Sequence, residues 1–320
     1  MTSTLVSHHH ARDLVGLAVL LEGLTASPAL AQRPPVFGTG IGIVELQATV
    51  KNERGELVTT LDRGAFTVYE DGTPQAITAF SRDDVAVSVG IVLDHSRSMR
   101  TTRRGVERAA LAFVRASNPQ DEVFVLNFAD KSSLDVPFTS DVQALEAGIG
   151  REDCIGGSAI RDATLAGVSY LAAHAARERK VLLVVTDGND NASVASAEEV
   201  REGARRRGIA IYSIGLLSDE GPAKANRARH ELEELAEETG GVLYCARAAD
   251  DVGAIARDLA RQIRSQYTIR YSPAKQAMDG SYRKVRLRAK GPGRLVVRTR
   301  AGYRAAPALR GEDGKKETGT

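Results

Sequence analysis

The stretch from Val85 to Met99, VAVSVGIVLDHSRSM, decides how the rest of the chain is interpreted. Its first part is a run of valine, isoleucine and leucine, which is typical of a strand buried on both faces inside a parallel sheet. Directly after this run come Asp94, Ser96 and Ser98 at alternate positions, so one carboxylate and two hydroxyls can turn toward one point. Ligands of open α/β sheets bind at this end of the strands. The stretch therefore predicts a ligand site at Asp94.

The chemistry of these side chains suggests which ligand the site takes. Carboxylate and hydroxyl oxygens suit a hard divalent cation such as Mg2+, which takes few protein carboxylates and keeps several waters. Alternatively, an Asp-x-Ser-x-Ser pattern caps the helix that follows it, which is its more frequent role in an arbitrary sequence. Its position at the end of a buried strand favours the metal site here.

The overall composition is that of an ordinary globular protein. The chain has 320 residues, of which 42% are hydrophobic and 26% are charged, enough for one large domain or two smaller ones. The formal net charge of +2 indicates neither nucleic acid nor an anionic membrane as the partner. Tryptophan is absent and aromatic residues make up 5%, which argues against a base-stacking surface. We therefore expect protein partners.

The N-terminus has the order of features that is typical of a secretory signal peptide. Arg12 precedes the apolar run LVGLAVLL, and an Ala-x-Ala sequence ends at Ala31. Acidic residues on both sides of the apolar run leave a short amphipathic helix as the alternative. The run is too short to span a bilayer, and no other stretch approaches the length required. We expect residues 1–31 to be removed and the mature chain to be exported, to the periplasm or the extracellular space.

Two segments far apart in the chain show the alternation of half-buried strands. Residues 36–82 include IGIVELQATV and AFTVYEDGTPQAITAF, and residues 266–304 include QYTIRYSP, YRKVRLRAK and RLVVRTRAGY. Neither segment has enough strands to be stable by itself. We therefore expect them to pack together as one small β-sandwich-like domain, into which the intervening residues are inserted. The tail of residues 305–320 is predicted to be disordered.

Strand and helix signals alternate over residues 83–265. After the strand before Asp94, strands are predicted at 122–128, 181–185, 209–216 and 242–245, and helices at 106–116, 159–175, 197–207, 228–238 and 251–265. Repeated strand-helix units of this spacing give a doubly wound, mostly parallel, Rossmann-like α/β sheet. Residues 131–140 are expected to add a short antiparallel edge strand. The flanking domain is expected at the edge of the sheet opposite Asp94, where the first strand begins and the last helix ends.

Two further loops are expected at the edge that carries Asp94. Gly156 and Gly157 allow a close backbone approach, and Ser158 follows them at the N-cap position of a predicted helix. A second buried strand ends in Thr186-Asp187-Gly188, which places another carboxylate at a strand tip. If the two strands are neighbours, one cation can be held by five side chains, Asp94, Ser96, Ser98, Ser158 and Asp187. With only two negative charges around it, such a cation can still attract an exogenous carboxylate.

The three motifs together resemble the metal-ion-dependent adhesion site of von Willebrand factor type A domains. They are D-x-S-x-S at 94–98, GGSAIRDA at 156–163 and TDG at 186–188. The flanking sequences FTVYEDGTPQAITAF, YTIRYSP and RAGY resemble the bacterial VWFA-related subgroup, so the resemblance covers roughly residues 41–303. It implies the von Willebrand type A fold, Mg2+ or Mn2+ as the cofactor, and a protein partner whose acidic residue completes the coordination. Members of the family usually have threonine where this chain has Ser158, which keeps the hydroxyl.

Two other classes of function remain open from the sequence. An Asp at a strand tip beside a cation also begins the site of aspartyl-phosphate phosphatases, which typically place a second carboxylate two residues later. Here that position is Ser96, and no Ser-His-Asp or Cys-His pairing is visible, so we predict a binding protein and no enzyme. In the third class, the metal loop is vestigial and the β-rich flanks mediate structural assembly.

Some other residues near the motifs have simpler interpretations. Strict alternation turns His95 away from Asp94 and predicts a position that faces solvent or a partner. Asp162 is expected to lie in the first turn of a helix or to support a metal ligand without binding the metal itself, while Asp190 either extends the site or caps the next segment. Cys154 and Cys245 are predicted to stay unpaired because they lie in different parts of the sheet.

Overall fold

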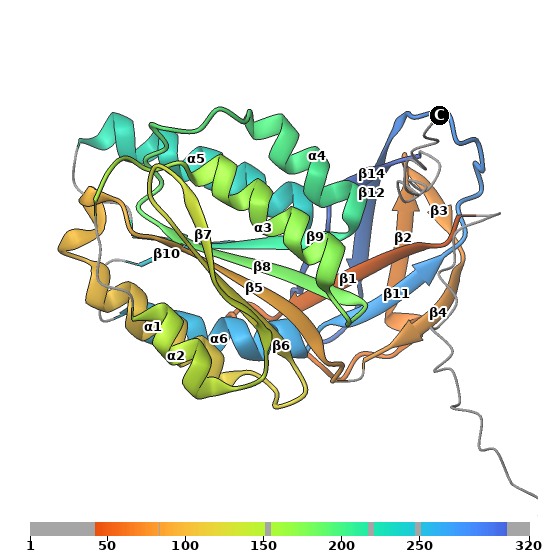
Figure 1. Cartoon of the computed structure of the whole chain (residues 1–320). Helices are drawn as coiled ribbons and strands as arrows, with labels where there is room; N and C mark the ends of the chain where they lie inside the picture. The colour runs from red at the N-terminus through yellow and green to blue at the C-terminus, as the bar shows by residue number, and fades with distance from the viewer. Residues whose placement is uncertain (1–41, 83, 151–154, 217–220, 247–250, 306–320) are drawn as a thin grey trace, which may run out of the picture. The chain divides into compact units, whose positions relative to one another are not determined.

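The computed structural model describes residues 42–82, 84–150, 155–216, 221–246 and 251–305 (Figure 1). The predicted signal peptide, Cys154 and residues 306–320 of the predicted tail lie outside these ranges. Within the ranges, no helix combines the length and the apolar character that crossing a bilayer requires.

A six-stranded sheet forms the centre of the fold, in the order β10-β9-β8-β5-β6-β7. Its strands are β5 (Val87–Asp94), β6 (Glu122–Phe128), β7 (Ser132–Thr139), β8 (Arg179–Thr186), β9 (Ile209–Gly215) and β10 (Leu243–Cys245). The strands are parallel except β7, which runs antiparallel to β6 at one edge. This confirms the predicted mostly parallel sheet and its antiparallel edge strand. It also makes β5 and β8, the strands that end at the two predicted carboxylates, direct neighbours.

Helices cover both faces of this sheet (Figure 1). One face is covered by α1 (Arg103–Ala116), α2 (Val142–Ile149) and α6 (Asp251–Arg264), and the other by α3 (Ile160–His174), α4 (Ala197–Arg207) and α5 (Pro222–Thr239). The prediction started α5 six residues too late. Pro222 takes the first helical turn, where its missing N–H costs no hydrogen bond.

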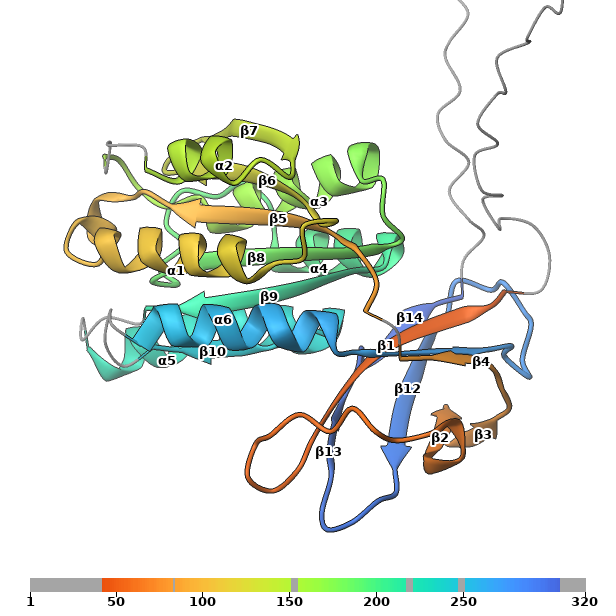
Figure 2. The same cartoon turned by 90° about the horizontal axis from the view of Figure 1, so that it is seen from below.

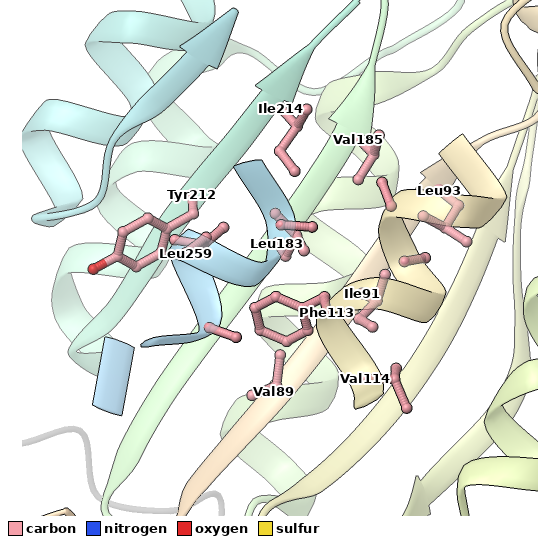
Figure 3. Packing of buried hydrophobic residues seen from close by; sticks show 14 of the residues in the cluster. Val89, Ile91, Leu93, Phe113, Val114, Leu183, Val185, Tyr212, Ile214 and Leu259 are labelled. Atoms are coloured by element: carbon pink, nitrogen blue, oxygen red, sulfur yellow. The ribbon is translucent and has the colours of Figure 1, made fainter. Parts of the chain in front are cut away.

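The strand before the site is buried along its whole length, as the apolar run predicts. Val89, Ile91 and Leu93 pack in the cluster that also contains Phe113 of α1 and Leu259 of α6 (Figure 3). Val92 belongs to the cluster on the opposite face, together with residues of α3 and α4. Each fully buried aliphatic side chain of this kind contributes about 1.5–3 kcal/mol to folding. The carboxyl end of β5 is therefore held rigidly from both sides.

Gly90 in the middle of β5 leaves no space for a side chain. An added Cβ would lie 2.4 Å from Phe124 Cζ and 2.6 Å from Leu182 Cδ1. We expect Gly90→Ala to lower the free energy of unfolding by about 1–3 kcal/mol, because the surrounding side chains must shift. Urea denaturation measures this.

Gly253 in α6 offers the matched control, because an added Cβ there meets only Arg257 Nη1 at 3.6 Å. Gly253→Ala should leave the stability unchanged or raise it by up to about 1 kcal/mol, since alanine favours the helix. Equal unfolding free energies for the two variants would contradict the packing described for β5.

Two four-stranded antiparallel sheets are formed by the two ends of the described chain. The first has the order β13-β1-β11-β4, with β1 (Val44–Lys51), β4 (Ile77–Ser81), β11 (Tyr267–Tyr271) and β13 (Val296–Arg298). The second has the order β14-β12-β2-β3, with β2 (Phe66–Glu70), β3 (Thr73–Gln75), β12 (Tyr282–Ala289) and β14 (Gly302–Arg304). Side chains from both sheets share one hydrophobic core. The α/β sheet is thus inserted in a β-sandwich-like domain, as the sequence predicts.

Polar contacts join this sandwich to the central sheet at the edge where the parallel strands begin. Arg179, the first residue of β8, donates to Thr268 Oγ1 at 3.1 Å and to the carbonyl of Ile263 at 2.9 Å. Gln266 donates to Tyr212 Oη of β9 at 2.8 Å. Figure 2 shows the arrowhead of β5 pointing away from β1, β11 and β12. The strand end at Asp94 therefore lies on the side away from the sandwich.

Candidate metal site

Asp94 is the last residue of β5 and is the point at which three loops meet. It is 2% exposed. Its Oδ1 accepts a hydrogen bond from the backbone N–H of Ser96 at 2.8 Å. Its Oδ2 accepts from Ser158 Oγ at 2.9 Å and from Thr186 Oγ1 at 2.6 Å. The buried carboxylate is thus bound by the segments after β5, before α3 and at the end of β8.

The two serines after Asp94 lie together at the start of a short 3-10 helix, η2 (Arg97–Arg100). The distance between Ser96 Oγ and Ser98 Oγ is 3.1 Å. Ser96 is buried beside Asp94, while Ser98 is exposed. The hydroxyls therefore extend the group of oxygen atoms from the buried strand end to the surface.

Ser158 reaches Asp94 because the preceding loop is tightly held. Gly156 has φ +86°, and an added Cβ there would lie 2.2 Å from Asp130 Oδ2. The N–H of Gly157 donates to Asp130 Oδ1 at 2.6 Å, and the N–H of Ser158 donates to Asn191 Oδ1 at 2.9 Å. The expected N-cap role of Ser158 is wrong: Ala159 occupies that position, and the Ser158 hydroxyl donates to Asp94.

Asp187 follows β8 and brings the second carboxylate to the same edge. It is 7% exposed, and its Oδ1 accepts from the backbone N–H of Asn189 at 3.1 Å. Burial raises the pKa of Asp94 against the hydrogen bonds from Ser96 and Thr186, and the negative charge of Asp187 adds to the rise. The structure therefore brings the five predicted ligand residues to one edge.

The donor atoms of this group fit a hard divalent cation. All are oxygens, from two carboxylates and three hydroxyls, which Mg2+ and Mn2+ prefer over nitrogen or sulfur. The hydrogen bonds that Asp94 and Asp187 accept come from backbone N–H groups and hydroxyls. The same ranges hold no group of three or more His, Cys, Asp or Glu that could bind a metal. A cation here would thus depend on two carboxylates supported by hydroxyls.

Thr186 is the residue of this group that the sequence analysis did not select. Its hydroxyl donates to Asp94 and accepts from the N–H of Gly188 at 3.0 Å. The available signal was a hydroxyl at the end of the strand next to β5, one position before the predicted ligand.

The expected exposure of His95 is wrong. This residue is only 5% exposed, and its backbone N–H donates to the carbonyl of Phe128 at 2.7 Å.

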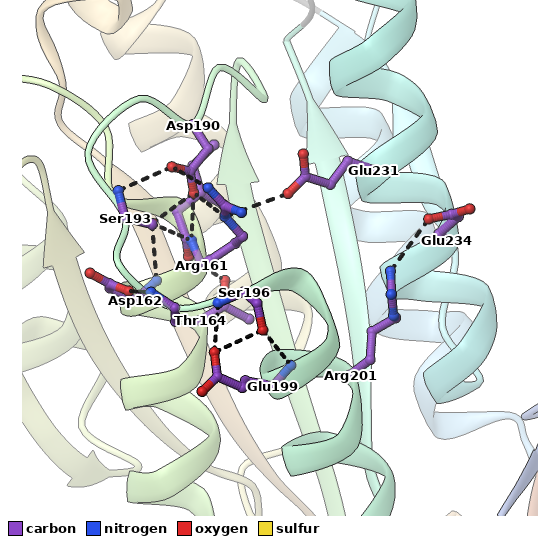
Figure 4. A network of polar contacts seen from close by, with 12 residues as sticks. Arg161, Asp162, Thr164, Asp190, Ser193, Ser196, Glu199, Arg201, Glu231 and Glu234 are labelled. Atoms are coloured by element: carbon purple, nitrogen blue, oxygen red, sulfur yellow. Dashed lines mark hydrogen bonds and ion pairs between the residues drawn. The ribbon is translucent and has the colours of Figure 1, made fainter. Parts of the chain in front are cut away.

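The remaining acidic residues of the motifs hold the loop after β8 in place (Figure 4). Asp190 Oδ2 accepts from the N–H of Arg161 at 2.9 Å and from Ser193 Oγ at 2.7 Å. Asp162 Oδ1 accepts from the N–H of Ala195 at 2.7 Å. The hydrogen bonds of Asp190 thus hold the loop against the first turn of α3.

Cys245 ends β10 at the edge of the central sheet, as predicted. Its side chain is exposed and forms no disulfide within the described ranges.

Comparison with known proteins gives one family. Residues 89–189 match the von Willebrand factor type A domain family, and this segment contains all five predicted ligand residues. The chain has no match among curated proteins.

Solved structures that are similar to this chain include three bacterial proteins. BatB from Bacteroides thetaiotaomicron is 20% identical, with 56% of this chain and 100% of that one covered and a TM-score of 0.44. The vWF domain of the type V pilus tip protein Mfa5 from Porphyromonas gingivalis is 12% identical, with coverages of 56% and 95% and a TM-score of 0.47. A von Willebrand factor type A protein from Catenulispora acidiphila is 15% identical, with coverages of 84% and 76% and a TM-score of 0.48.

Similarity at this level carries no information on function. The family assignment rests instead on the match over residues 89–189. This segment includes most of β5, all of β8 and the loops that meet at Asp94. The prediction made from the three motifs is thereby confirmed: residues 89–189 match the von Willebrand factor type A domain family.

Proposed function

We propose that this chain is an exported, divalent-metal-dependent protein-binding module of the adhesion type. Mg2+ or Mn2+ would be held by Asp94, Ser96, Ser98, Ser158 and Asp187, and an acidic residue of the partner protein would complete its coordination. One observation carries the proposal: the buried carboxylate of Asp94 accepts hydrogen bonds from three loops and lies near the second buried carboxylate, that of Asp187.

The charge balance of the site favours binding of an anionic group. When bound, a divalent cation supplies a Lewis-acidic position that attracts a carboxylate. Ser96, Ser98 and Ser158 contribute neutral oxygens, so the protein's own two carboxylates do not exceed the charge of the cation. Because Ser98 is exposed while Asp94 and Ser158 are buried, the partner would approach from the side of Ser98.

Calorimetry with Mg2+ tests the proposal directly. The EDTA-treated protein should bind one Mg2+, and a Mg2+ concentration 100 times the Kd should stabilise it by about 2.7 kcal/mol. This corresponds to a rise in Tm of roughly 4 °C for a chain of this size. Asp94→Ala should lose both the binding heat and the rise in Tm, because it removes the carboxylate at the centre of the site.

Asp258→Asn provides the control, because this carboxylate lies in α6 and pairs with Lys51 and Arg261. It should bind Mg2+ as the parent does. A parent protein with no binding heat, and the same Tm in Mg2+ and EDTA, would refute the proposed function. Metal-dependent hydrolysis of a phosphate or ester substrate, lost in Asp94→Asn, would replace it with the enzyme alternative.

A further inference from the structure

The edge that carries the proposed metal site also carries unpaired positive charge. Arg97 and Arg100 of η2 and Arg104 of α1 are all exposed. Within the part of the chain that the structure describes, none of their guanidinium groups forms an ion pair or a hydrogen bond. Several other arginines of the molecule are paired, for example Arg161 with Asp190 and Arg205 with Glu202. The segment that directly follows Asp94, Ser96 and Ser98 in the chain therefore carries three exposed positive side chains.

The stability of the fold does not explain these arginines. The first turn of α1 contains no acidic residue and begins with Arg103 and Arg104, although cations at a helix N-terminus oppose the helix dipole. By contrast, α4 has acidic residues in its first turn and arginines in its last turn, as the dipole favours. Each misplaced exposed charge costs about 0.3–1 kcal/mol. The arrangement at α1 therefore points to an interaction with something outside the described chain.

Two apolar side chains are exposed on the loops at this edge. Ile155 is 68% exposed and Val194 is 94% exposed, which are the two largest values among the large apolar residues of the described ranges. Ile155 precedes Gly156, whose carbonyl accepts from the N–H of Arg97 at 3.3 Å. Val194 lies in the loop that Asp162 and Asp190 hold in place. Exposed apolar residues beside charged ones are typical of protein interaction sites.

We propose that this edge binds an acidic segment of a partner protein, with several carboxylates and at least one apolar side chain. One carboxylate completes the coordination of the cation, and others pair with Arg97, Arg100 and Arg104. The apolar side chain contacts Ile155 or Val194. The inference rests on the proposed function and adds the chemistry of the partner: a run of Asp or Glu residues with an apolar residue, in place of a single acidic residue.

Charge complementarity favours this occupant over others. Arginine binds carboxylates through paired N–H groups, and the positive charge of η2 and the start of α1 attracts an acidic segment before contact. The two exposed apolar side chains favour a peptide over nucleic acid, whose phosphate backbone offers them no apolar contact.

A labelled synthetic peptide of eight glutamates and two leucines is the probe. Its binding to the EDTA-treated protein, followed by fluorescence anisotropy, should require added Mg2+. The triple variant Arg97→Gln, Arg100→Gln, Arg104→Gln should bind the peptide about tenfold more weakly, because each lost exposed pair contributes several tenths of a kcal/mol. The variant should fold as well as the parent, since it relieves the repulsion at the start of α1.

The triple variant Arg54→Gln, Arg286→Gln, Arg294→Gln is the control, because it removes the same charge from exposed positions outside η2 and α1. It should bind the peptide as the parent does. Mg2+ calorimetry on the Arg97, Arg100, Arg104 variant should give the affinity of the parent, which places the loss in peptide binding.

Three outcomes would overturn the inference. If the parent binds Mg2+ but both triple variants bind the peptide equally well, the acidic segment is wrong while the metal site stands. If the parent binds no Mg2+, the proposed function fails and this inference fails with it. If a DNA duplex binds as tightly as the peptide, in EDTA as well as in Mg2+, the edge is a general surface for polyanions.

Discussion

Deletion of residues 266–320 should yield a product that aggregates and binds a hydrophobic dye. The deletion removes β11, which lies between β1 and β4, and β12, which lies between β14 and β2. The apolar faces of β1 and β2, with the fully buried Leu46 and Val68, then lose their cover. Each such side chain forfeits about 1.5–3 kcal/mol of burial, and a contiguous exposed apolar patch favours association.

The same deletion leaves a buried carboxylate without its partners. Glu70 at the end of β2 is 3% exposed, and its Oε2 accepts from Tyr271 Oη and Tyr303 Oη at 2.8 Å each. Arg283 Nη1 lies 3.5 Å from Glu70 Oε1. Because all three partners come from the deleted residues, the ionised carboxylate must return to water, which opens the sheet around it.

Light scattering after gel filtration and dye fluorescence measure the effect. A chain shortened only to Ala305, which removes residues 306–320 of the predicted tail and keeps the buried, hydrogen-bonded Ala305, is the control and should keep the Tm of the full chain. A chain that lacks residues 266–320 but remains monomeric, keeps its Tm and protects β1 and β2 from proteolysis would contradict the pairing of the two ends.

Asp94→Asn should stabilise the metal-free protein and abolish its response to Mg2+. The folded state raises the pKa of Asp94 because the carboxylate is buried, so folding disfavours the ionised form. The Asp94 carboxyl therefore lowers the free energy of unfolding. This loss of stability is absent below the pKa that Asp94 has in the unfolded chain, and it grows as the pH rises through the pKa of the folded state. The amide keeps an oxygen for the N–H of Ser96 and carries no charge. In EDTA at pH 7, we expect a gain of about 1–3 kcal/mol.

Urea denaturation of parent and variant in EDTA, at pH 7 and at pH 3, measures the gain. The difference should shrink at the lower pH, where the carboxyl group is protonated in both folded and unfolded states. In Mg2+ the order should reverse, since only the parent binds the cation. A variant that is less stable than the parent in EDTA at pH 7 would contradict this prediction. It would show that groups of the protein already stabilise the ionised carboxylate of Asp94 enough to offset its burial.

Local signals in the sequence were sufficient for several elements of the fold. The bounds of α4 agree with the prediction, because Ser196 and Glu199 form a capping box and Gly208 ends the helix with φ +64°. The bounds of β6 also agree with the prediction, because polar residues directly precede its apolar run. By contrast, α2 has only eight residues, and no prediction covered it. Its main signal is the Asp141 cap, which by itself does not distinguish a helix from a turn.

The site was predictable in its residues and less so in their contacts. The end of a buried strand identifies Asp94 and Asp187, because both follow long apolar runs. The local rule placed Ser158 at a helix cap, but its hydroxyl binds a carboxylate 64 positions away in the chain. Alternation correctly turns His95 away from Asp94, yet it does not reveal that the far side is covered by other parts of the chain. Both errors come from contacts between distant segments, which spacing along the sequence does not encode.

A crystal grown with Mn2+ and measured for anomalous scattering tests the central claim most directly. We predict one strong anomalous peak within coordination distance of the carboxylates or hydroxyls of Asp94, Ser96, Ser98, Ser158 and Asp187, and no peak there in crystals of Asp94→Ala. A Mn2+-soaked parent crystal with no peak at this edge, or with its peak at another part of the molecule, would contradict the assignment of the metal site.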